Sequence, residues 1–486
     1  MKNKFNEYNL SDKMSRRTIL KVTGAALGAG LTGVAGGGIT GSLFNTLGTG
    51  SARAFASPSA LKGKPNLLFI LGDNHNARTM GCAGHPFIKT PGMDRLAREG
   101  VMFQRAFNTT SLCSPSRASI LAGMYAHRHG VLNNHTPWTD KETSFMEHLS
   151  RAGYATAFIG KWHMPGRLPK FPFLDLFVTY TYREGQGAYF NTPMLVNGKE
   201  VPSRKPYITE EVTDYAIEFI EKNNPKDGDR PFCVYLSHRP GHPPFQAPVD
   251  ISGMYDEADV TEVLPPHVDP LWYGKTNQNV FQGVMMGSYY DQYRGYCETL
   301  TAMDRDIVNI LDYLDQKGLS DNTIVIYMGD NGMQWGTHDC HGIREPYEDS
   351  IRLPFIVRAP GMVKDPGGKR KQMVLNIDIA PTLLDLAGVR APDDMDGMSI
   401  VPSIRNLRAK TRNDFLLEFW RYYPENTPSY RGIRTDRYKY VEFERGRDPW
   451  LFDLDNDPHE KKNLYETKKG RKLVPGLKKK METYAR

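Results

Sequence analysis

The sequence predicts an α/β sandwich followed by a small antiparallel sheet. Apolar runs of strand length recur up to about residue 390, and each ends in glycine or polar residues. Between two of these runs, apolar side chains recur at helical spacing from 300 to 314. Strands that alternate with helices are typical of α/β proteins. Beyond residue 391, short strand-like segments separated by turn residues replace this alternation, which predicts an antiparallel sheet.

Local signals define the first four elements. Residues 65–71 form a continuous apolar run, which predicts a buried strand of the parallel type. Residues 90–100 begin with Thr-Pro and end in glycine, which predicts a short helix. Residues 101–107 predict a second strand, and residues 114–123 predict a helix with Cys113 at its N-terminus. Backbone N–H groups at the start of a helix favour anions.

Three further apolar runs predict strands at 155–160, 231–236 and 323–328. Each of them, like the run at 65–71, is followed at once by polar residues. In open α/β sheets, ligands bind at the edge where the strands end. We therefore expect these residues to meet at that edge: Asp73, Asn74, Lys161, His163, His238, His242, Asp330 and Asn331.

The domain organisation predicted is a catalytic domain at 60–390 and a C-terminal subdomain at 391–486. The subdomain begins with short strands and ends in a basic tail, for which a solvated helix is the favoured interpretation. Before it, the Pro- and Asp-rich stretch 255–280 predicts a long loop or lid over the site. The predicted strands of the small sheet are 415–420, 430–434, 438–443 and 450–453.

The N-terminus carries an export signal. Residues 15–21, Ser-Arg-Arg-Thr-Ile-Leu-Lys, match the twin-arginine signal. An uncharged stretch rich in glycine and alanine follows, with small residues for cleavage near Ala54. We interpret residues 1–54 as a removed signal peptide rather than a membrane anchor, because the stretch is only weakly hydrophobic. The expected partner is the twin-arginine translocon, and the expected location is the periplasm or the exterior, without stable membrane insertion.

The charge distribution argues against a nucleic-acid partner. The whole chain of 486 residues carries +7, but residues 1–54 account for +5 and residues 461–486 for +8. Residues 55–460 therefore carry −6. A nucleic-acid-binding body is usually basic, and no nucleic-acid motif is present.

Oxygen donors after two strands suggest a metal site, and the cysteines argue against zinc. Asp73, Asn74, Asp330 and Asn331 follow two apolar runs and suit Ca²⁺ or Mg²⁺ better than zinc. The five cysteines show no paired spacing, so a zinc site is not expected, and disulfide pairing is left open.

Cationic and titratable residues complete the constellation. Lys161 and His163 are two positions apart after a strand and point the same way. A histidine such as His238 or His242 protonates a departing alcohol when its pKa lies near the working pH. Arg117 lies one helical turn beyond Cys113, on the same face of the predicted helix.

The chain resembles the type I, formylglycine-dependent sulfatases of the alkaline phosphatase superfamily. The resemblance extends from residue 65 to about residue 464 and is densest in Cys113-Ser-Pro-Ser-Arg117 and the apolar run that follows it. Its other motifs are Gly160-Lys161-Trp162-His163, His242-Pro243-Pro244, Gly329-Asp330-Asn331-Gly332, residues 346–354, residues 438–440, residues 451–454 and Asp457-Pro458.

The resemblance implies an alkaline-phosphatase-like fold, in which a mixed sheet is sandwiched between helices. It also implies one calcium ion and conversion of Cys113 to formylglycine by a formylglycine-generating enzyme. One hydroxyl of the formylglycine hydrate attacks sulfur, and the other then expels sulfate. The implied metal ligands are Asp73, Asp330, Asn331 and modified Cys113. Arg117 orients the hydrate, Lys161 and His163 bind sulfate, and His242 assists the leaving group.

Two positions depart from the family pattern. Many members have a second aspartate where this chain has Asn74, which predicts weaker calcium binding if its amide oxygen is a ligand. Many also have a lysine where this chain has Ile343. Arg344 takes over that sulfate contact after a one-residue shift, or the contact is absent or supplied by Arg239.

The function predicted is an exported sulfatase acting on a sulfate ester of a sulfated carbohydrate. One alternative is a phosphonate or phosphate ester hydrolase on the same scaffold, for which Asn74 leaves room. Another is a non-catalytic glycan-binding protein in which Cys113 stays unmodified.

Overall fold

We describe the protein from a computed structural model. It describes residues 63–139, 143–166, 171–181, 185–224, 230–265, 288–422 and 427–484. The chain divides into the units Met1–Phe55 and Ala56–Arg486, and everything below concerns the second. The proposed signal peptide and residues 266–280 of the expected lid lie outside the described residues.

A large sheet forms the centre of the described structure. Strand β1 (Asn66–Gly72) pairs in parallel with β7 (Phe232–Ser237) on one side and β8 (Thr323–Gly329) on the other. Strand β3 (Ala155–Gly160) continues the parallel run beside β7, and β4 (Leu176–Tyr180) lies beside β3. These strands are continuous apolar runs because both faces of the sheet are covered.

Antiparallel strands at both ends make the sheet mixed. Strand β2 (Val101–Phe107) pairs antiparallel with β11 and β12 and in parallel with β13. Within the described residues the sheet has eleven strands, ordered β11-β2-β12-β8-β1-β7-β3-β4-β5-β6, with β13 beside β2. The remaining strands are β5 (Met194–Val196), β6 (Lys199–Val201), β11 (Arg352–Leu353), β12 (Phe355–Arg358) and β13 (Gly368–Leu375).

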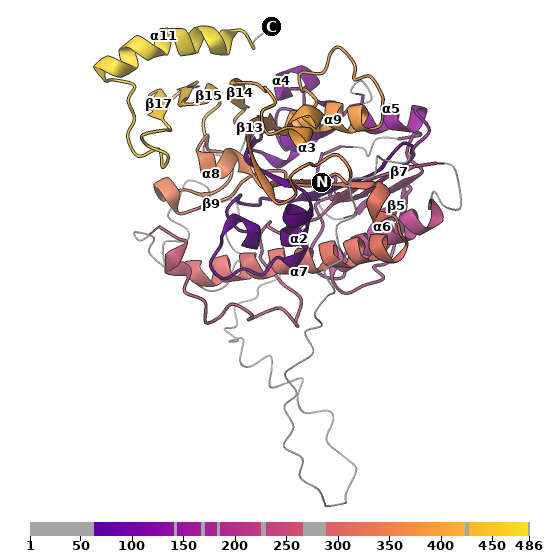
Figure 1. Cartoon of the computed structure of the whole chain (residues 1–486). Coiled ribbons are helices and arrows are strands. Elements are labelled where there is room, and N and C mark those ends of the chain that lie inside the picture. Colours follow the sequence, from indigo (N-terminus) through magenta and orange to yellow (C-terminus); the bar gives the residue numbers. More distant parts are fainter. Residues whose placement is uncertain are drawn as a thin grey trace, which may run out of the picture. The chain divides into compact units, whose positions relative to one another are not determined.

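Helices cover the sheet on both faces, as Figure 1 shows, with α2, α6 and α7 on one side and α3, α5 and α9 on the other. Strand β1 illustrates why, since Leu68 and Ile70 join one apolar core while Phe69 and Leu71 join the other. The α-helices here are α2 (Pro91–Glu99), α3 (Cys113–Ala122), α4 (Ala126–His129), α5 (Phe145–Arg151), α6 (Ile208–Lys222), α7 (Tyr289–Gln316), α8 (Glu348–Ile351), α9 (Ile379–Leu386) and α10 (Val401–Arg405).

Short elements link these layers. They are β9 (Gln334–Trp335), which pairs with β10 (His341–Gly342), and the 3-10 turns η1 (Gly81–Ala83), η2 (Val260–Glu262), η4 (Ser320–Asn322), η5 (Thr337–Asp339) and η6 (Asn376–Asp378).

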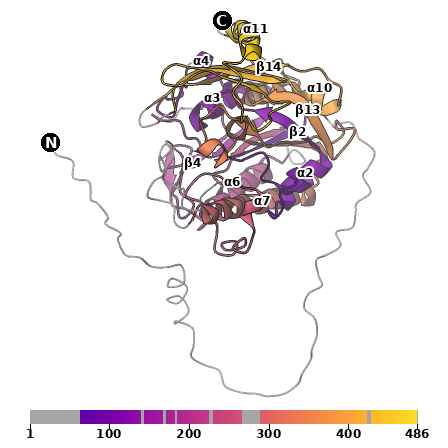
Figure 2. The same ribbon diagram turned by 90° about the vertical axis from the view of Figure 1, so that its left-hand side faces the viewer.

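A four-stranded antiparallel sheet precedes the C-terminal helix α11 (Lys468–Glu482), and Figure 2 shows both above α3. The Phe415 ring packs on Phe107 of the large sheet, with ring centroids 5.2 Å apart. The small sheet is thereby anchored beside the end of β2. Its strands are β14 (Asp414–Phe419), β15 (Tyr430–Thr435), β16 (Tyr438–Phe443) and β17 (Trp450–Asp453).

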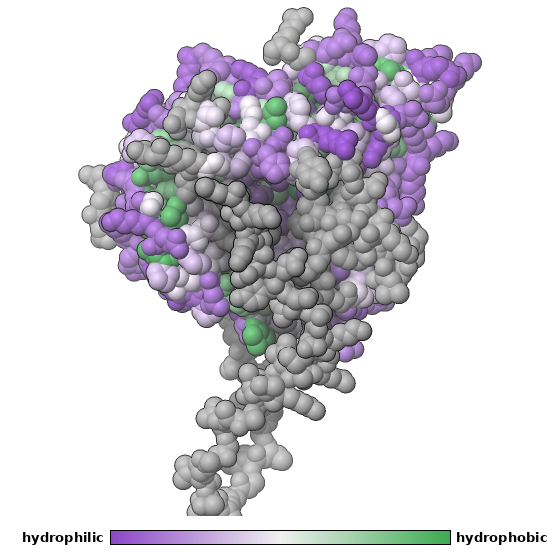
Figure 3. Space-filling model, turned by 180° about the vertical axis from the view of Figure 1, so that it is seen from behind, coloured by the Kyte–Doolittle hydropathy of each residue, from purple (hydrophilic) through white to green (hydrophobic). Residues whose placement is uncertain are grey.

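The fold class and the strands and helices predicted from local signals are confirmed. On the face turned away from the viewer in Figure 1, the described residues that are visible are mostly hydrophilic, with small separate apolar patches (Figure 3). Among the described residues, no helix combines the length and the apolar character needed to span a bilayer.

Candidate active site

The ends of two neighbouring strands begin the site. Gly72 and Gly329 are partners in the β1–β8 pairing, so the residues after them, Asp73 and Asp330, leave the sheet side by side. The pair is tied together because the Asn74 backbone N–H donates to Asp330 Oδ1 at 3.0 Å. Asn74 takes a positive φ of 41°, a conformation that asparagine adopts more readily than most residues.

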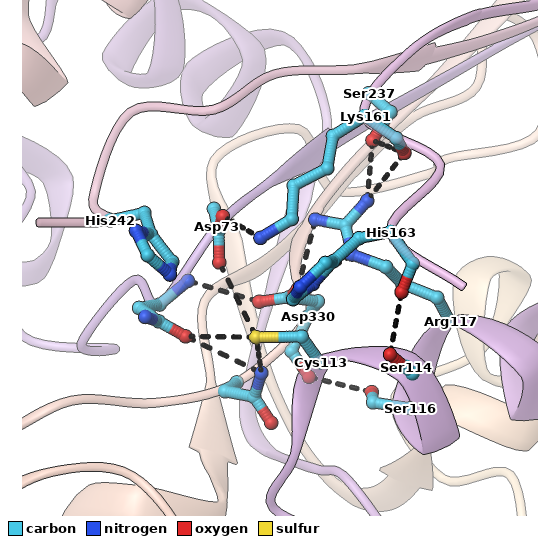
Figure 4. Close-up of polar contacts among 12 residues, drawn as sticks. Asp73, Cys113, Ser114, Ser116, Arg117, Lys161, His163, Ser237, His242 and Asp330 are labelled. Atoms are coloured by element: carbon cyan, nitrogen blue, oxygen red, sulfur yellow. Dashed lines mark hydrogen bonds and ion pairs between the residues drawn. The ribbon is translucent and has the colours of Figure 1, made fainter. Parts of the chain in front are cut away.

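Cys113, the first residue of α3, faces both strand ends (Figure 4). Its Sγ lies 3.9 Å from Asp73 Oδ1 and 3.8 Å from Asn74 Oδ1. The Asn331 amide Nδ2 lies 3.6 Å from the same sulfur. These four side chains and that of Asp330 are all buried. The edge rule for α/β sheets and the helix prediction therefore converge on one thiol.

This cluster fits a hard divalent cation. One ligand atom from each of Asp73, Cys113 and Asp330 lies within 4.8 Å of the others. Burial, together with repulsion from Asp330, raises the pKa of Asp73 to about 6. A cation between the two carboxylates relieves that repulsion, and oxygen donors of this kind suit Ca²⁺ or Mg²⁺. The asparagine side chains at 74 and 331 add amide groups at the same place.

Arg117 connects the cluster to the neighbouring strands. Its Nε and Nη2 both contact Asp330 Oδ2 at 2.9 Å, which makes a buried ion pair. Its Nη1 donates to the Ser237 hydroxyl at 2.6 Å and to the Lys161 carbonyl at 2.9 Å. The guanidinium is thus held rigidly one turn beyond Cys113 in α3.

Lys161 follows β3 and pairs with Asp73 through an ion pair in which neither side chain is exposed. The site thus contains two buried carboxylates and two buried cations. His163 lies two residues on, and its carbonyl accepts a hydrogen bond from Ser114 Oγ at 2.5 Å. The loop after β3 is therefore attached to the first turn of α3.

His242 closes another side of the site (Figure 4). Its Nδ1 lies 2.6 Å from the Pro243 carbonyl, and the Gln186 amide Nε2 lies 2.6 Å from its Nε2. Burial, with the charges of Lys161 and Arg239, lowers the pKa of His242 well below its usual value. The imidazole is therefore uncharged near neutral pH.

Two expected residues lie apart from the cluster contacts. Burial lowers the pKa of His238 to about 3, so this imidazole is neutral and supplies no cation. Arg344 is buried, and its Nη2 lies 3.5 Å from the Tyr422 hydroxyl. Its backbone N–H donates to Ser111, two residues before Cys113. Ile343 is part of the apolar core.

Comparison with known proteins identifies the chain. The sequence model of the sulfatase family matches residues 65–389, which include the whole cluster. The chain is a member of the sulfatase family. A second model, N-sulphoglucosamine sulphohydrolase, C-terminal, matches residues 336–486 of this sulfatase. It is therefore an enzyme of the alkaline phosphatase superfamily, as the sequence motifs predicted.

Characterised relatives span most of its length. It is 30% identical over 470 residues to the N-acetylglucosamine-6-O-sulfatase of Bacteroides thetaiotaomicron, covering 83% of each chain. It is 31% identical to an ulvan-active sulfatase of Formosa agariphila, covering 82% of this chain and 77% of the relative. A solved complex with D-glucosamine-2-N,6-O-disulfate as substrate superposes with a TM-score of 0.77 at 27% identity, over 87% of this chain and 98% of the other.

Three residues of the sulfatase site were missed by the sequence analysis. Ser237 and Asn108 stand at the ends of β7 and β2, so the strand-end rule contained the signal for both. Asn108 Nδ2 donates to Asn331 Oδ1 at 3.1 Å and thereby orients that amide. Gln186 comes from a loop with no motif, and only the structure brings it to His242.

The structure also shows whether the cysteines form disulfides. All five cysteines lie in the described residues, and all are free thiols. Burial raises the pKa of the Cys113 thiol to about 12. As an unmodified thiol it therefore stays protonated and is a poor nucleophile.

Proposed function

We propose that this sulfatase hydrolyses a sulfate ester of a sulfated carbohydrate, with Cys113 converted to formylglycine beside one calcium ion. The relatives named for N-acetylglucosamine-6-O-sulfate and ulvan support the carbohydrate. So does the glucosamine disulfate in the similar solved complex. The observation that carries the proposal is the convergence of Asp73, Asp330 and Cys113 at one buried point.

The residues that would hold calcium are Asp73, Asp330 and Asn331, with modified Cys113 and, through its amide oxygen, Asn74. When bound, the ion supplies positive charge that stabilises the sulfate oxygens and the deprotonated nucleophile. Formylglycine, once formed at Cys113, supplies a hydrated aldehyde, one hydroxyl of which attacks sulfur while the other later releases sulfate.

The chain's own side chains prepare this step. Arg117 is held by Asp330 and Ser237 and presents a fixed charge beside residue 113. Lys161, paired with Asp73, adds a second cation to the same wall. We propose that Lys161 and His163 bind the sulfate oxygens and that Arg117 orients the hydrate.

Proton transfer to the leaving alcohol falls to His242 in this proposal. Its Nδ1 proton is held by the Pro243 carbonyl, so Nε2 is the nitrogen that takes up a proton, and the Gln186 amide that contacts Nε2 must then turn away. A bound sulfate raises the imidazole pKa by its negative charge, and the protonated ring then donates to the departing oxygen. His238 and Arg344 are proposed to line the site without transferring the proton.

We further propose that residues 1–54 direct export through the twin-arginine translocon. That route carries folded proteins, so a formylglycine-generating enzyme acts on Cys113 before the protein reaches the periplasm or the exterior. Residues 60–390 are the proposed catalytic domain, and residues 391–486 form the C-terminal subdomain.

A paired assay tests the reaction class. The natively produced enzyme is given 4-nitrophenyl sulfate, an aryl phosphonate monoester and a panel of defined sulfated saccharides. We expect sulfate release, fastest from a saccharide. A phosphonate rate far above every sulfate rate would instead support the phosphonate hydrolase, and binding of saccharides without any turnover would support a glycan-binding protein.

A further inference from the structure

Arg239 is a buried cation without a carboxylate partner in the described residues. The residue is 4% exposed and lies on the loop that follows β7. Removing a charge from water is costly unless an opposite charge compensates it. Several other buried arginines have such partners, as in the pairs Arg117–Asp330, Arg358–Glu99 and Arg370–Asp365.

Only some of the N–H groups of the Arg239 guanidinium have a hydrogen-bond acceptor. Its Nη2 donates to the Pro243 carbonyl at 3.0 Å. Its Nε and Nη1 are buried and have no hydrogen-bond partner among the described residues. The guanidinium carbon lies 4.6 Å from the centroid of the Tyr189 ring, a cation–π contact that steadies the group without accepting those hydrogen bonds. Two fixed donors are therefore available to a ligand.

This guanidinium is adjacent to the leaving-group side of the active site. The Pro243 carbonyl that Nη2 of Arg239 contacts is the same oxygen that lies 2.6 Å from Nδ1 of His242. Because they share this oxygen, Arg239 Nη2 and His242 Nδ1 are at most about 5.6 Å apart. The Tyr189 hydroxyl donates to the His242 carbonyl at 2.7 Å, which fixes the ring beneath Arg239 to the same loop.

A second buried donor belongs to the same neighbourhood. Tyr180, the last residue of β4, is 1% exposed, and its hydroxyl has no hydrogen-bond partner among the described residues. Its ring packs against Gly187, in the loop that carries Gln186 to His242 and Tyr189 to Arg239. His238, next to Arg239 in sequence, is neutral and adds no negative charge.

We propose that Arg239, assisted by the Tyr180 hydroxyl, binds a second anionic group of the substrate beside the sulfate ester that is cleaved. This inference rests on the proposed function and narrows its substrate to saccharides with two anionic groups. Guanidinium donors match the oxygens of sulfate and carboxylate equally well. The second group is therefore a sulfate or a carboxylate near the scissile bond.

Calorimetric binding to the full-chain Cys113→Ala variant with calcium tests this without turnover. The probes are glucosamine-6-O-sulfate, glucosamine-2-N,6-O-disulfate, and glucosamine-6-O-sulfate linked to a uronic acid. At least one doubly anionic probe should bind about tenfold more tightly than the monosulfate. Adding Arg239→Gln should abolish that advantage while changing monosulfate affinity less than about threefold. The sulfate and carboxylate probes distinguish the two kinds of second group.

Two further variants keep the outcome decisive. Tyr180→Phe removes one oxygen atom and should reduce the same advantage several-fold, even if Arg239→Gln folds poorly. Arg390→Gln, at an arginine side chain that is 84% exposed, should change nothing. Equal binding of all three probes, or equal weakening of all three by Arg239→Gln, overturns the inference. Failure of the wild-type enzyme to release sulfate from any ester counts against the proposed function instead.

Discussion

Asp330→Asn is the most informative single change in the buried site. Both carboxylate oxygens of Asp330 accept hydrogen bonds, one from the Asn74 backbone and the other from Arg117 Nε, with Arg117 Nη2 also in ion-pair contact. An amide has only one oxygen, so in either orientation its NH₂ group faces a donor. The variant also leaves the Arg117 charge buried without its partner. Breaking a buried ion pair by removing one member costs about 3–5 kcal/mol.

This loss translates into a measurable melting shift. Unfolding entropy of about 2.1 cal/mol/K per residue over roughly 400 residues gives about 0.8 kcal/mol/K. The expected fall in Tm is therefore about 4–6 °C. Calorimetry at one scan rate, with EDTA in every sample, separates this effect from the loss of a metal ligand.

Asp393→Asn provides the matched control. Asp393 pairs with Arg390 at 2.8 Å, but both side chains are more than four-fifths exposed. An exposed pair contributes about 0–1 kcal/mol, so its loss should move Tm by about 1 °C or less. Equal Tm values for the Asp330→Asn and Asp393→Asn proteins would refute the assignment of Asp330 as the buried partner that compensates Arg117.

The remaining predictions concern the nucleophile and the metal. Cys113→Ala and unconverted Cys113→Ser should abolish steady-state sulfate release, because neither side chain can form the aldehyde, while circular dichroism and Tm stay close to wild type; turnover by either contradicts the mechanism. Chelation of calcium should stop turnover and lower Tm, since an ion that binds only the folded state stabilises it, and re-addition should restore both; full activity in chelator would rule out a catalytic ion. Asn74→Asp should tighten calcium binding in a calorimetric titration, because it restores a negative charge 3.8 Å from Cys113 Sγ; unchanged affinity would place Asn74 outside the ligand set.

The clustering of Asp73, Cys113, Lys161 and Asp330 could be predicted because the signals are local. Continuous apolar runs identified the ends of β1, β3, β7 and β8, and the rule that ligands bind at the carboxyl edge brought Asp73, Lys161 and Asp330 together. The helix start at Cys113 followed from its own flanking residues. None of these predictions required knowing which strands pair across large distances in the sequence.

Features that depend on long-range pairing could not be predicted in the same way. The strand at 101–107 was expected, but its antiparallel partners β11 and β12 come about 250 residues later. Gln186 reaches His242 from a loop between two positive-φ glycines, and nothing in its own sequence marks it. The contact of Arg344 with the Tyr422 hydroxyl likewise depends on the C-terminal part of the chain.

The central claim is that Cys113 becomes the nucleophile of a sulfate ester hydrolase. Mass spectrometry of the Cys113 peptide from natively produced protein, paired with sulfate release by the same sample, tests it most directly. The account predicts a peptide whose mass reflects oxygen in place of sulfur and the loss of two hydrogens, with turnover that rises in proportion to the converted fraction. An intact thiol in fully active enzyme would contradict it.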